Sequence, residues 1–248
     1  MKYITAIGGL SVGHWTEPVA LTGCTAIICE NGAVCGVDVR GSAPGTRETD
    51  LLRGYNSVTG INAVMLCGGS AFGLDAASGA MRYLEERGLG VDVGTGVVPI
   101  VPAAVIFDLG VGDSSIRPTK DDGYAACLDA KAGVYSTGRV GVGTGATVGK
   151  AFGPKFAMSS GIGSSCIDIG GGVKIGALVA VNALGDVYNP ETGCIVAGAR
   201  DGDGFLNCMS MTSKSAAPAG FTNTTIGVIA TNASLTREEA NKIASMGH

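Results

Sequence analysis

The chain alternates short apolar runs with polar, glycine-rich turns. Apolar runs that predict strands cover residues 24–30, 33–40, 61–66, 97–109, 167–169, 173–182 and the segment beginning at Thr224. Asn31-Gly32 separates the first two runs and is typical of a tight hairpin turn. Gly170-Gly171-Gly172 separates a later pair and predicts a second hairpin.

Helical spacing appears in three places. Apolar residues from Ala71 to Leu84 recur every three or four positions, so we expect a helix capped by Ser70, running to about Arg87 and ended by Gly88. A shorter pattern covers 122–132, and a capping box at 236–239 begins a third helix. Hairpins, interleaved helices and then strands again predict a layered α+β domain rather than alternating βαβ units.

Composition adds an expectation about assembly. The chain has 248 residues and contains no stretch that resembles a linker, so we expect a single domain over 1–248. Hydrophobic residues make up 46% and charged ones only 15% of the chain, against an average of about 25% charged. Much of the chain should therefore lie in the interior or between subunits, which favours a homo-oligomer. The 42 glycines are scattered and predict many tight turns.

The net charge and the absence of targeting signals limit the classes of partner and the location that we expect. The net charge is −4 and no block of Lys or Arg occurs, so we expect no nucleic-acid or anionic-membrane partner and favour a small molecule or peptide. Neither a secretory signal nor a membrane-spanning stretch is evident, which predicts a soluble cytoplasmic protein. The eight cysteines include no C-x-x-C pair, so we expect reduced thiols, no metal site and no other cofactor.

The most distinctive candidate for chemistry is Thr224, which follows a long polar loop over 198–219 and begins an apolar strand. Cleavage of the Asn223–Thr224 bond would place a new α-amine, with a reference pKa of about 7.7–8.0, beside the Thr224 hydroxyl. One residue would then supply nucleophile and base. The only histidines are His14 and His248, so a Ser-His-Asp triad is poorly supplied. The alternative is that Asn223 and Thr224 are ordinary turn and strand-edge residues.

Other polar positions carry two interpretations each. Asn182 ends an apolar strand and either makes a structural hydrogen bond or points its amide at a reacting carbonyl oxygen. The turn Gly68-Gly69-Ser70 either holds an oxyanion or carboxylate on its N–H groups or simply joins strand to helix. Lys150 follows a glycine-rich run that does not match a phosphate-binding loop. The loop 40–50 is either solvated or a carboxylate-binding rim.

Five motifs together resemble the DmpA-like family of L-aminopeptidase/D-esterases, which includes β-peptidyl aminopeptidases and nylon-oligomer hydrolases. The motifs lie at 39–50, 68–75, 98–104, 143–150 and 223–228, so the resemblance spans nearly the whole chain. It implies an αββα sandwich with N-terminal-nucleophile chemistry. The precursor would cut itself between Asn223 and Thr224, giving subunits of 1–223 and of the residues from Thr224 onward.

The resemblance also assigns roles. The Thr224 hydroxyl would accept the acyl group of a short peptide or of a β- or ω-amino-acid amide, Asn182 would help hold the oxyanion, and Lys150 would support the site electrostatically. Processed units would form a homo-oligomer. Family members often carry Tyr where this chain has Phe107, so a phenolic hydroxyl is expected to be missing.

The family also continues past Gly247-His248 into an acidic or hydroxyl-bearing segment, so we expect a fragment of a longer product or a truncated form. Two other hypotheses remain open: a non-catalytic, glycine-rich oligomeric protein that binds a small ligand, and an acyltransferase with the same nucleophile.

Overall fold

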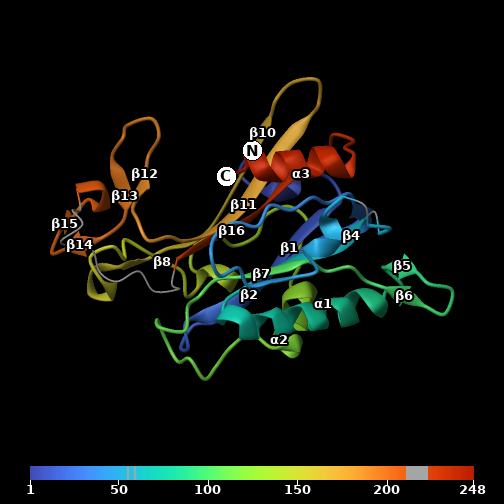
Figure 1. The fold of residues 1–248 in the computed structure, drawn as a ribbon, viewed down its shortest axis with the longest axis horizontal. Coiled ribbons are helices and arrows are strands. Elements are labelled where there is room, and N and C mark those ends of the chain that lie inside the picture. Colours follow the sequence, from blue (N-terminus) through green and yellow to red (C-terminus); the bar gives the residue numbers. More distant parts are fainter. Residues whose placement is uncertain (55, 59, 211–222) are drawn as a thin grey trace.

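Two β-sheets packed face to face form the centre of the protein (Figure 1). The computed structural model describes residues 1–54, 56–58, 60–210 and 223–248. The larger sheet has the strand order β1 (Leu10–Glu17), β2 (Thr22–Ala33), β4 (Ile61–Cys67), β7 (Ala103–Val105) and β3 (Thr46–Arg47). Its strands are antiparallel except for the parallel pair β4 and β7.

The smaller sheet is fully antiparallel, with the order β10 (Gly161–Asp168), β11 (Lys174–Asn182) and β16 (Thr224–Thr231). Two-residue and three-residue strands form ladders in the loops: β5 (Val91–Asp92) with β6 (Val97–Val98), β8 (Thr147–Val148) with β9 (Met158–Ser159), β12 (Val187–Tyr188) with β13 (Ile195–Ala197), and β14 (Arg200–Asp201) with β15 (Gly204–Phe205). The helices are α1 (Ala76–Glu85), α2 (Lys120–Leu128) and α3 (Arg237–Met246).

The core follows from the alternation of side chains along β2. Ala26 and Ile28 point toward α1 and α2, whereas Ile27 points to the other face and packs with Leu178 of the smaller sheet. Because β2 is covered on both faces, its sequence is apolar without alternation. The helices lie close together because Gly79 and Gly123 have no side chain: a Cβ on either would come within 2 Å of a backbone oxygen of the other helix.

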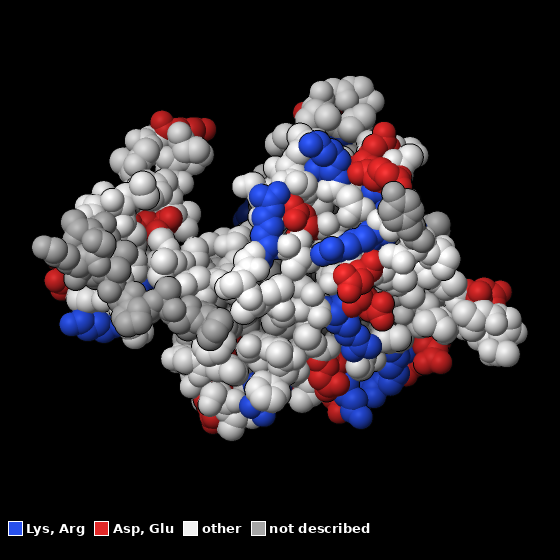
Figure 2. All heavy atoms as spheres, in the orientation of Figure 1, with Lys and Arg blue, Asp and Glu red and all other residues white. Residues whose placement is uncertain are grey.

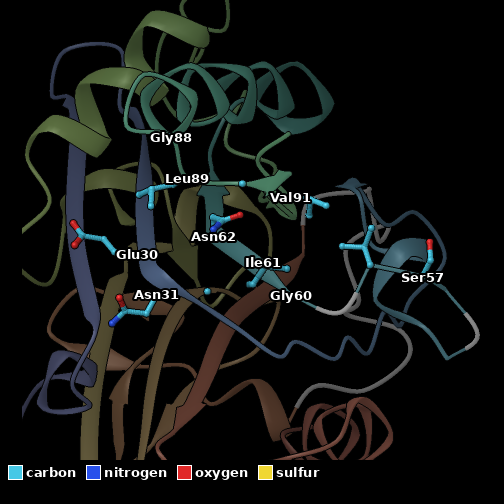
Figure 3. Close-up of a pocket in the computed structure, with 12 residues that line it drawn as sticks. Glu30, Asn31, Ser57, Gly60, Ile61, Asn62, Gly88, Leu89 and Val91 are labelled. Atoms are coloured by element: carbon cyan, nitrogen blue, oxygen red, sulfur yellow. The ribbon is translucent and has the colours of Figure 1, made fainter. Parts of the chain in front are cut away.

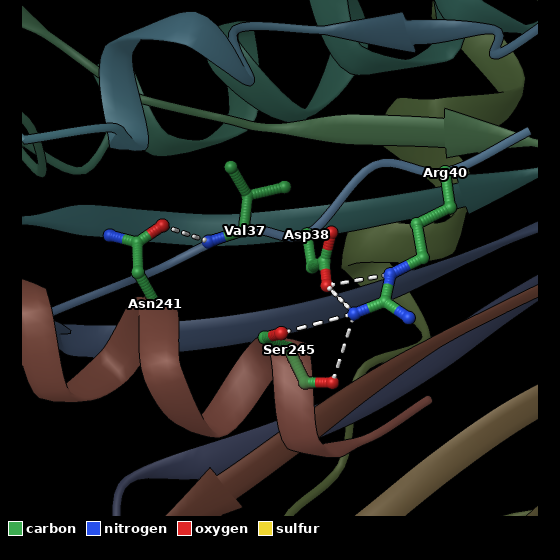
Figure 4. Close-up of polar contacts among 5 residues, drawn as sticks. All are labelled: Val37, Asp38, Arg40, Asn241 and Ser245. Carbon is green, nitrogen blue, oxygen red and sulfur yellow. Dashed lines mark hydrogen bonds and ion pairs between the residues drawn. The ribbon is translucent and has the colours of Figure 1, made fainter.

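Helix α3 lies on the outer face of the smaller sheet, on the side of the protein opposite to α1 and α2 (Figure 1). There, Gly247 contacts Ile229 on the outer face of β16. Figure 4 shows how it is fastened. The Asn241 side chain accepts a hydrogen bond from the Val37 N–H at 3.0 Å and donates one to the Leu52 carbonyl at 2.9 Å. Near the end of the helix, Arg40 joins the carboxylate of Asp38 to the Ser245 hydroxyl (Figure 4).

The resulting order of layers is helices, sheet, sheet and helix. This arrangement is the expected αββα sandwich, and it is an α+β fold. On the face in Figure 2, basic and acidic side chains are interspersed rather than gathered by sign. Within the described ranges, no helix has the length and apolar character needed to cross a membrane.

The predicted hairpin at Asn31-Gly32 is wrong. Both residues lie inside β2, which pairs with β1 over eight positions, from Leu10 opposite Cys29 to Glu17 opposite Thr22. The hairpin turn therefore falls at 18–21. Gly32 has a φ of +71° at a place where the register between β2 and β4 shifts, so Asn31-Gly32 forms an irregularity within a long strand.

The Ser70 cap is also wrong. Ser70 is the first residue of a 3₁₀ turn over Ser70–Asp75, which precedes α1. The N-cap residue of this turn is Gly69, and no side chain caps the turn. Other predicted elements are confirmed: β4, the hairpin of β10 and β11 around Gly170-Gly172, the strand from Thr224, and the capping box of Thr236 and Glu239. All eight cysteines are free, and five are buried.

Gly36 provides a test of how α3 is docked. A Cβ at this position would lie 2.2 Å from the Asn241 nitrogen and 2.3 Å from the Ala240 carbonyl carbon. Gly36→Ala should therefore push the helix away and lower the free energy of unfolding by about 1–3 kcal/mol. Gly110→Ala is the matched control, because nothing lies within 4 Å of its Cβ. Equal denaturation midpoints for the two variants would contradict this packing.

Candidate active site

The pairing of β11 with β16 places Asn182 directly opposite Thr224. On β11, Leu178 and Ala180 face the larger sheet, and on β16 Ile226 does the same. Asn182 and Thr224 fall on the same alternation as these apolar residues. Both side chains therefore lie on the inner face, where directly opposed Cβ atoms are about 4.5–5.5 Å apart.

The carboxamide of Asn182 is held from both ends. Its Nδ2 donates to the carbonyl oxygen of Phe107 at 2.9 Å. Its Oδ1 accepts from the Thr147 N–H at 3.0 Å and from Lys150 Nζ at 2.8 Å. The side chain is 0% exposed. Because an ammonium group only donates, the contact with Lys150 fixes which end of the amide is oxygen, and the NH₂ group points toward Phe107.

Lys150 is bound to the end of β11 through both side chain and backbone. Its Nζ also donates to the Asn182 carbonyl at 3.0 Å, and its N–H donates to the Leu184 carbonyl at 2.8 Å. Burial lowers the pKa of Lys150 to about 8. The amine is therefore mainly protonated at neutral pH but sensitive to small increases in pH.

Phe107 contributes its backbone rather than its ring to this cluster. The ring is half-buried, and the residue follows β7 at the end where Ile106 N–H donates to the Cys67 carbonyl at 2.9 Å. The phenolic hydroxyl expected in the family is absent at this position, while the carbonyl that orients Asn182 is independent of the side chain.

The three backbone N–H groups of the Gly68-Gly69-Ser70 turn all donate hydrogen bonds within the protein. Its three N–H groups donate to the Gly23 carbonyl at 2.8 Å, to Asp108 Oδ1 at 2.6 Å and to the Ile106 carbonyl at 3.0 Å. They are therefore not available to the oxyanion that the sequence suggested. The turn does hold a carboxylate, but that carboxylate belongs to Asp108 of the same chain, so its role is structural.

Two residues of the candidate site, Thr147 and Asp108, were not singled out in the sequence. Thr147 lies in the glycine-rich motif before Lys150, and its N–H and hydroxyl both donate to Asn182 Oδ1. Asp108 is a single carboxyl at the end of an apolar run, which is a usable signal for a buried polar contact. Asn223 is exposed next to Thr224. Residues 211–219 of the predicted loop lie outside the described residues, and its first part contains β14 and β15.

A hollow of about 600 Å³ lies elsewhere (Figure 3). Glu30, Asn62 and Leu89 are among its lining residues, and so is Ile61, the first residue of β4. Phe107 and Asn182 lie beyond the other end of β4, so this hollow is separate from the Thr224 region. Among the residues that the structure describes, no group of three or more His, Cys, Asp or Glu is arranged to hold a metal ion.

Comparison with known proteins decides the family. The sequence profile described as peptidase family S58 matches residues 2–248. The chain belongs to peptidase family S58. An uncharacterized aminopeptidase of Mycobacterium tuberculosis is 44% identical over 266 residues, covering 100% of this chain and 75% of the relative. A 6-aminohexanoate-oligomer endohydrolase of Kocuria sp. is 31% identical, covering 97% of this chain and 66% of the relative.

Solved structures agree on the fold of this S58 chain. A β-aminopeptidase of Burkholderia sp. superposes with a TM-score of 0.70 at 18% identity, over 98% of this chain and 65% of that one. The L-aminopeptidase D-Ala-esterase/amidase of Ochrobactrum anthropi, described as a variant of the Ntn hydrolase fold, gives 0.69 at 18% identity, over 99% and 67%. These findings confirm the resemblance to DmpA-like enzymes. As a member of a peptidase family with a 44% identical relative named as an aminopeptidase, the chain is an amide hydrolase, which disfavours the non-catalytic hypothesis.

The environment of Lys150 makes a spectroscopic prediction. In a ¹³C- and ¹⁵N-labelled sample, one lysine side chain should titrate near pH 8, because burial disfavours its charged form. Lys150→Arg should remove that signal, whereas Lys242→Arg, at an exposed position on α3, should leave it in place. Titration of every lysine near its ordinary value would contradict the buried position of Lys150.

Proposed function

We propose that this chain is a self-processing amide hydrolase in which Thr224, freed as an N-terminal residue, is the nucleophile. The observation that carries this proposal is the position of Thr224, directly opposite a buried Asn182 whose amide is fixed by Lys150 and Phe107. A nucleophile next to a buried, oriented amide and a cation matches the needs of acyl transfer.

In the processing step, the Thr224 hydroxyl oxygen attacks the Asn223 carbonyl carbon. The C–N bond between the two residues breaks, the hydroxyl proton ends on the departing Thr224 nitrogen, and an ester joins Asn223 to the Thr224 oxygen. Water then hydrolyses the ester, which leaves a carboxylate on Asn223 and a free hydroxyl and amine on Thr224. The products are 1–223 and a second subunit that begins at Thr224.

In turnover, the new α-amine acts as the base. Its reference pKa of about 7.7–8.0 lets it accept the hydroxyl proton near neutral pH while the oxygen attacks the substrate amide. The substrate C–N bond then breaks, the amine leaves with that proton, and water hydrolyses the ester on Thr224. We assign the Asn182 NH₂ group to the oxyanion of the tetrahedral intermediate, with one hydrogen kept on Phe107. Lys150, bound to the amide oxygen, polarises the carboxamide and makes the NH₂ a stronger donor.

The substrate class that we propose is short peptides and β- or ω-amino-acid amides with a free amine. The relatives named as aminopeptidase and as 6-aminohexanoate-oligomer endohydrolase support it. We further propose a homo-oligomer of processed units located in the cytoplasm; the low share of charged residues supports the first of these.

Mass spectrometry of the full-length gene product under denaturing conditions tests the processing step. The wild-type protein should give two masses that correspond to a break before Thr224, and Thr224→Ala should remain intact. Thr225→Ala is the matched control: it changes the same residue type one position along, at an exposed outer-face site, and should still be cut. A wild-type protein that stays in one piece, or an intact Thr225→Ala, would contradict the assignment.

The pH dependence of turnover tests the role of Lys150. The rate should rise as the Thr224 amine loses its proton and fall as pH passes about 8, because the Lys150 cation is then lost. Lys150→Arg stays charged and should move the falling limb upward, and Lys150→Met should lower kcat by about 10²-fold or more. Lys242→Arg should leave the profile unchanged. A falling limb that is the same in Lys150→Arg would show that another group is responsible.

A further inference from the structure

Asp108 is a buried carboxyl that the proposed reaction does not use. The residue is 3% exposed. Its Oδ1 accepts from the Gly69 N–H at 2.6 Å and its Oδ2 accepts from the Thr22 hydroxyl at 2.8 Å. No ion pair with it is found within the described ranges of the chain. Burial raises the pKa of this carboxyl, while the two hydrogen bonds oppose that rise.

The space for this carboxyl is made by missing side chains. A Cβ on Gly68 would lie 2.1 Å from Asp108 Oδ2, and a Cβ on Gly145 would lie 2.6 Å from the Asp108 Cβ. Asp108 thus lies where the beginning of β2, the turn after β4 and the turn before β8 meet. Removing this carboxyl would take the acceptor from the Gly69 N–H and from the Thr22 hydroxyl. The loss should therefore disturb all three segments.

Two segments next to Asp108 also hold Asn182. Phe107, its immediate neighbour, offers the carbonyl that takes the Asn182 NH₂ group. Gly145 lies two residues before Thr147, whose N–H and hydroxyl bind the Asn182 oxygen. The carboxyl group of Asp108 therefore lies at the point where both supports of the Asn182 amide are joined.

We propose that Asp108 is a positioning residue for the catalytic amide of Asn182. By fastening the turn at Gly69 and packing against Gly145, it keeps the Phe107 carbonyl and the Thr147 N–H at the separation that Asn182 spans. Asp108 itself does not contact the substrate. This inference rests on the proposed function for its kinetic consequence, but the placement of the amide is measurable without turnover.

The kinetic arm compares Asp108→Asn with Ser164→Ala in the processed full-length enzyme. Asp108→Asn keeps the size of the side chain but removes the acceptor that faces Thr22, so kcat should fall by about 10- to 100-fold with KM within about twofold. Ser164 is a matched hydrogen-bond centre away from the site: its Oγ accepts from Ile4 N–H and Tyr135 and donates to the Ala177 carbonyl. Ser164→Ala should lower Tm while leaving kcat unchanged.

The second arm follows the NH₂ group of Asn182 directly by NMR. Its NH₂ resonances are assigned by their loss in Asn182→Ala. Asp108→Asn should shift them and speed their hydrogen exchange at least about 10-fold, whereas Ser164→Ala should not. Unchanged NH₂ resonances in Asp108→Asn, or an equal kcat loss in Ser164→Ala, would overturn the role of Asp108. An intact, inactive wild-type protein whose amide still responds to Asp108→Asn would contradict the proposed function alone.

Discussion

The register between β11 and β16 is the constraint on which the candidate site depends. Eight residue pairs run from Ile175 opposite Thr231 to Asn182 opposite Thr224. A shift of one residue would turn every side chain of β16 to the other face, exposing Ile226 and Val228 and moving Thr224 away from Asn182. The apolar contacts between the two sheets therefore fix the place of the nucleophile that we propose.

Polar groups at the edge of this apolar core require hydrogen-bond partners. Removing one partner of a buried donor or acceptor costs about 1–3 kcal/mol, a considerable part of the stability of a typical domain. Asn182 meets this requirement with contacts from Phe107, Thr147 and Lys150, and Asp108 with contacts from Gly69 and Thr22. Groups held this way lose little freedom during a reaction, which is the condition for electrostatic preorganisation.

The sequence predicted the elements in which periodicity and turn chemistry agree. The hairpin of β10 and β11 is one such element, as are β16 and the capped helix α3. The hairpin predicted at Asn31-Gly32 is wrong because β2 pairs with β1 over eight positions instead of folding back at this turn. The longer strand pairing outweighs the local turn preference. Local propensity is weak beside extended strand pairing and burial.

The candidate site was only partly accessible from the sequence. Thr224 and Asn182 have local signals, as an unusual hydroxyl and an unusual amide at strand ends, whereas Lys150 came from the family resemblance. The carbonyl of Phe107 has no signal, because every residue carries one. Contacts such as Thr147 to Asn182 and Gly69 to Asp108 join positions 35 and 39 residues apart, which only the folded topology brings together.

Trapping the covalent intermediate would show which atom of the enzyme carries the acyl group during turnover. The processed enzyme is mixed with an amino-acid ester substrate, quenched in acid during turnover and digested for peptide mass mapping. We expect an acyl group in ester linkage on the fragment that begins with Thr224, carried by the Thr224 oxygen. An acyl group on any other residue, or turnover without an acyl-enzyme on this fragment, would contradict it.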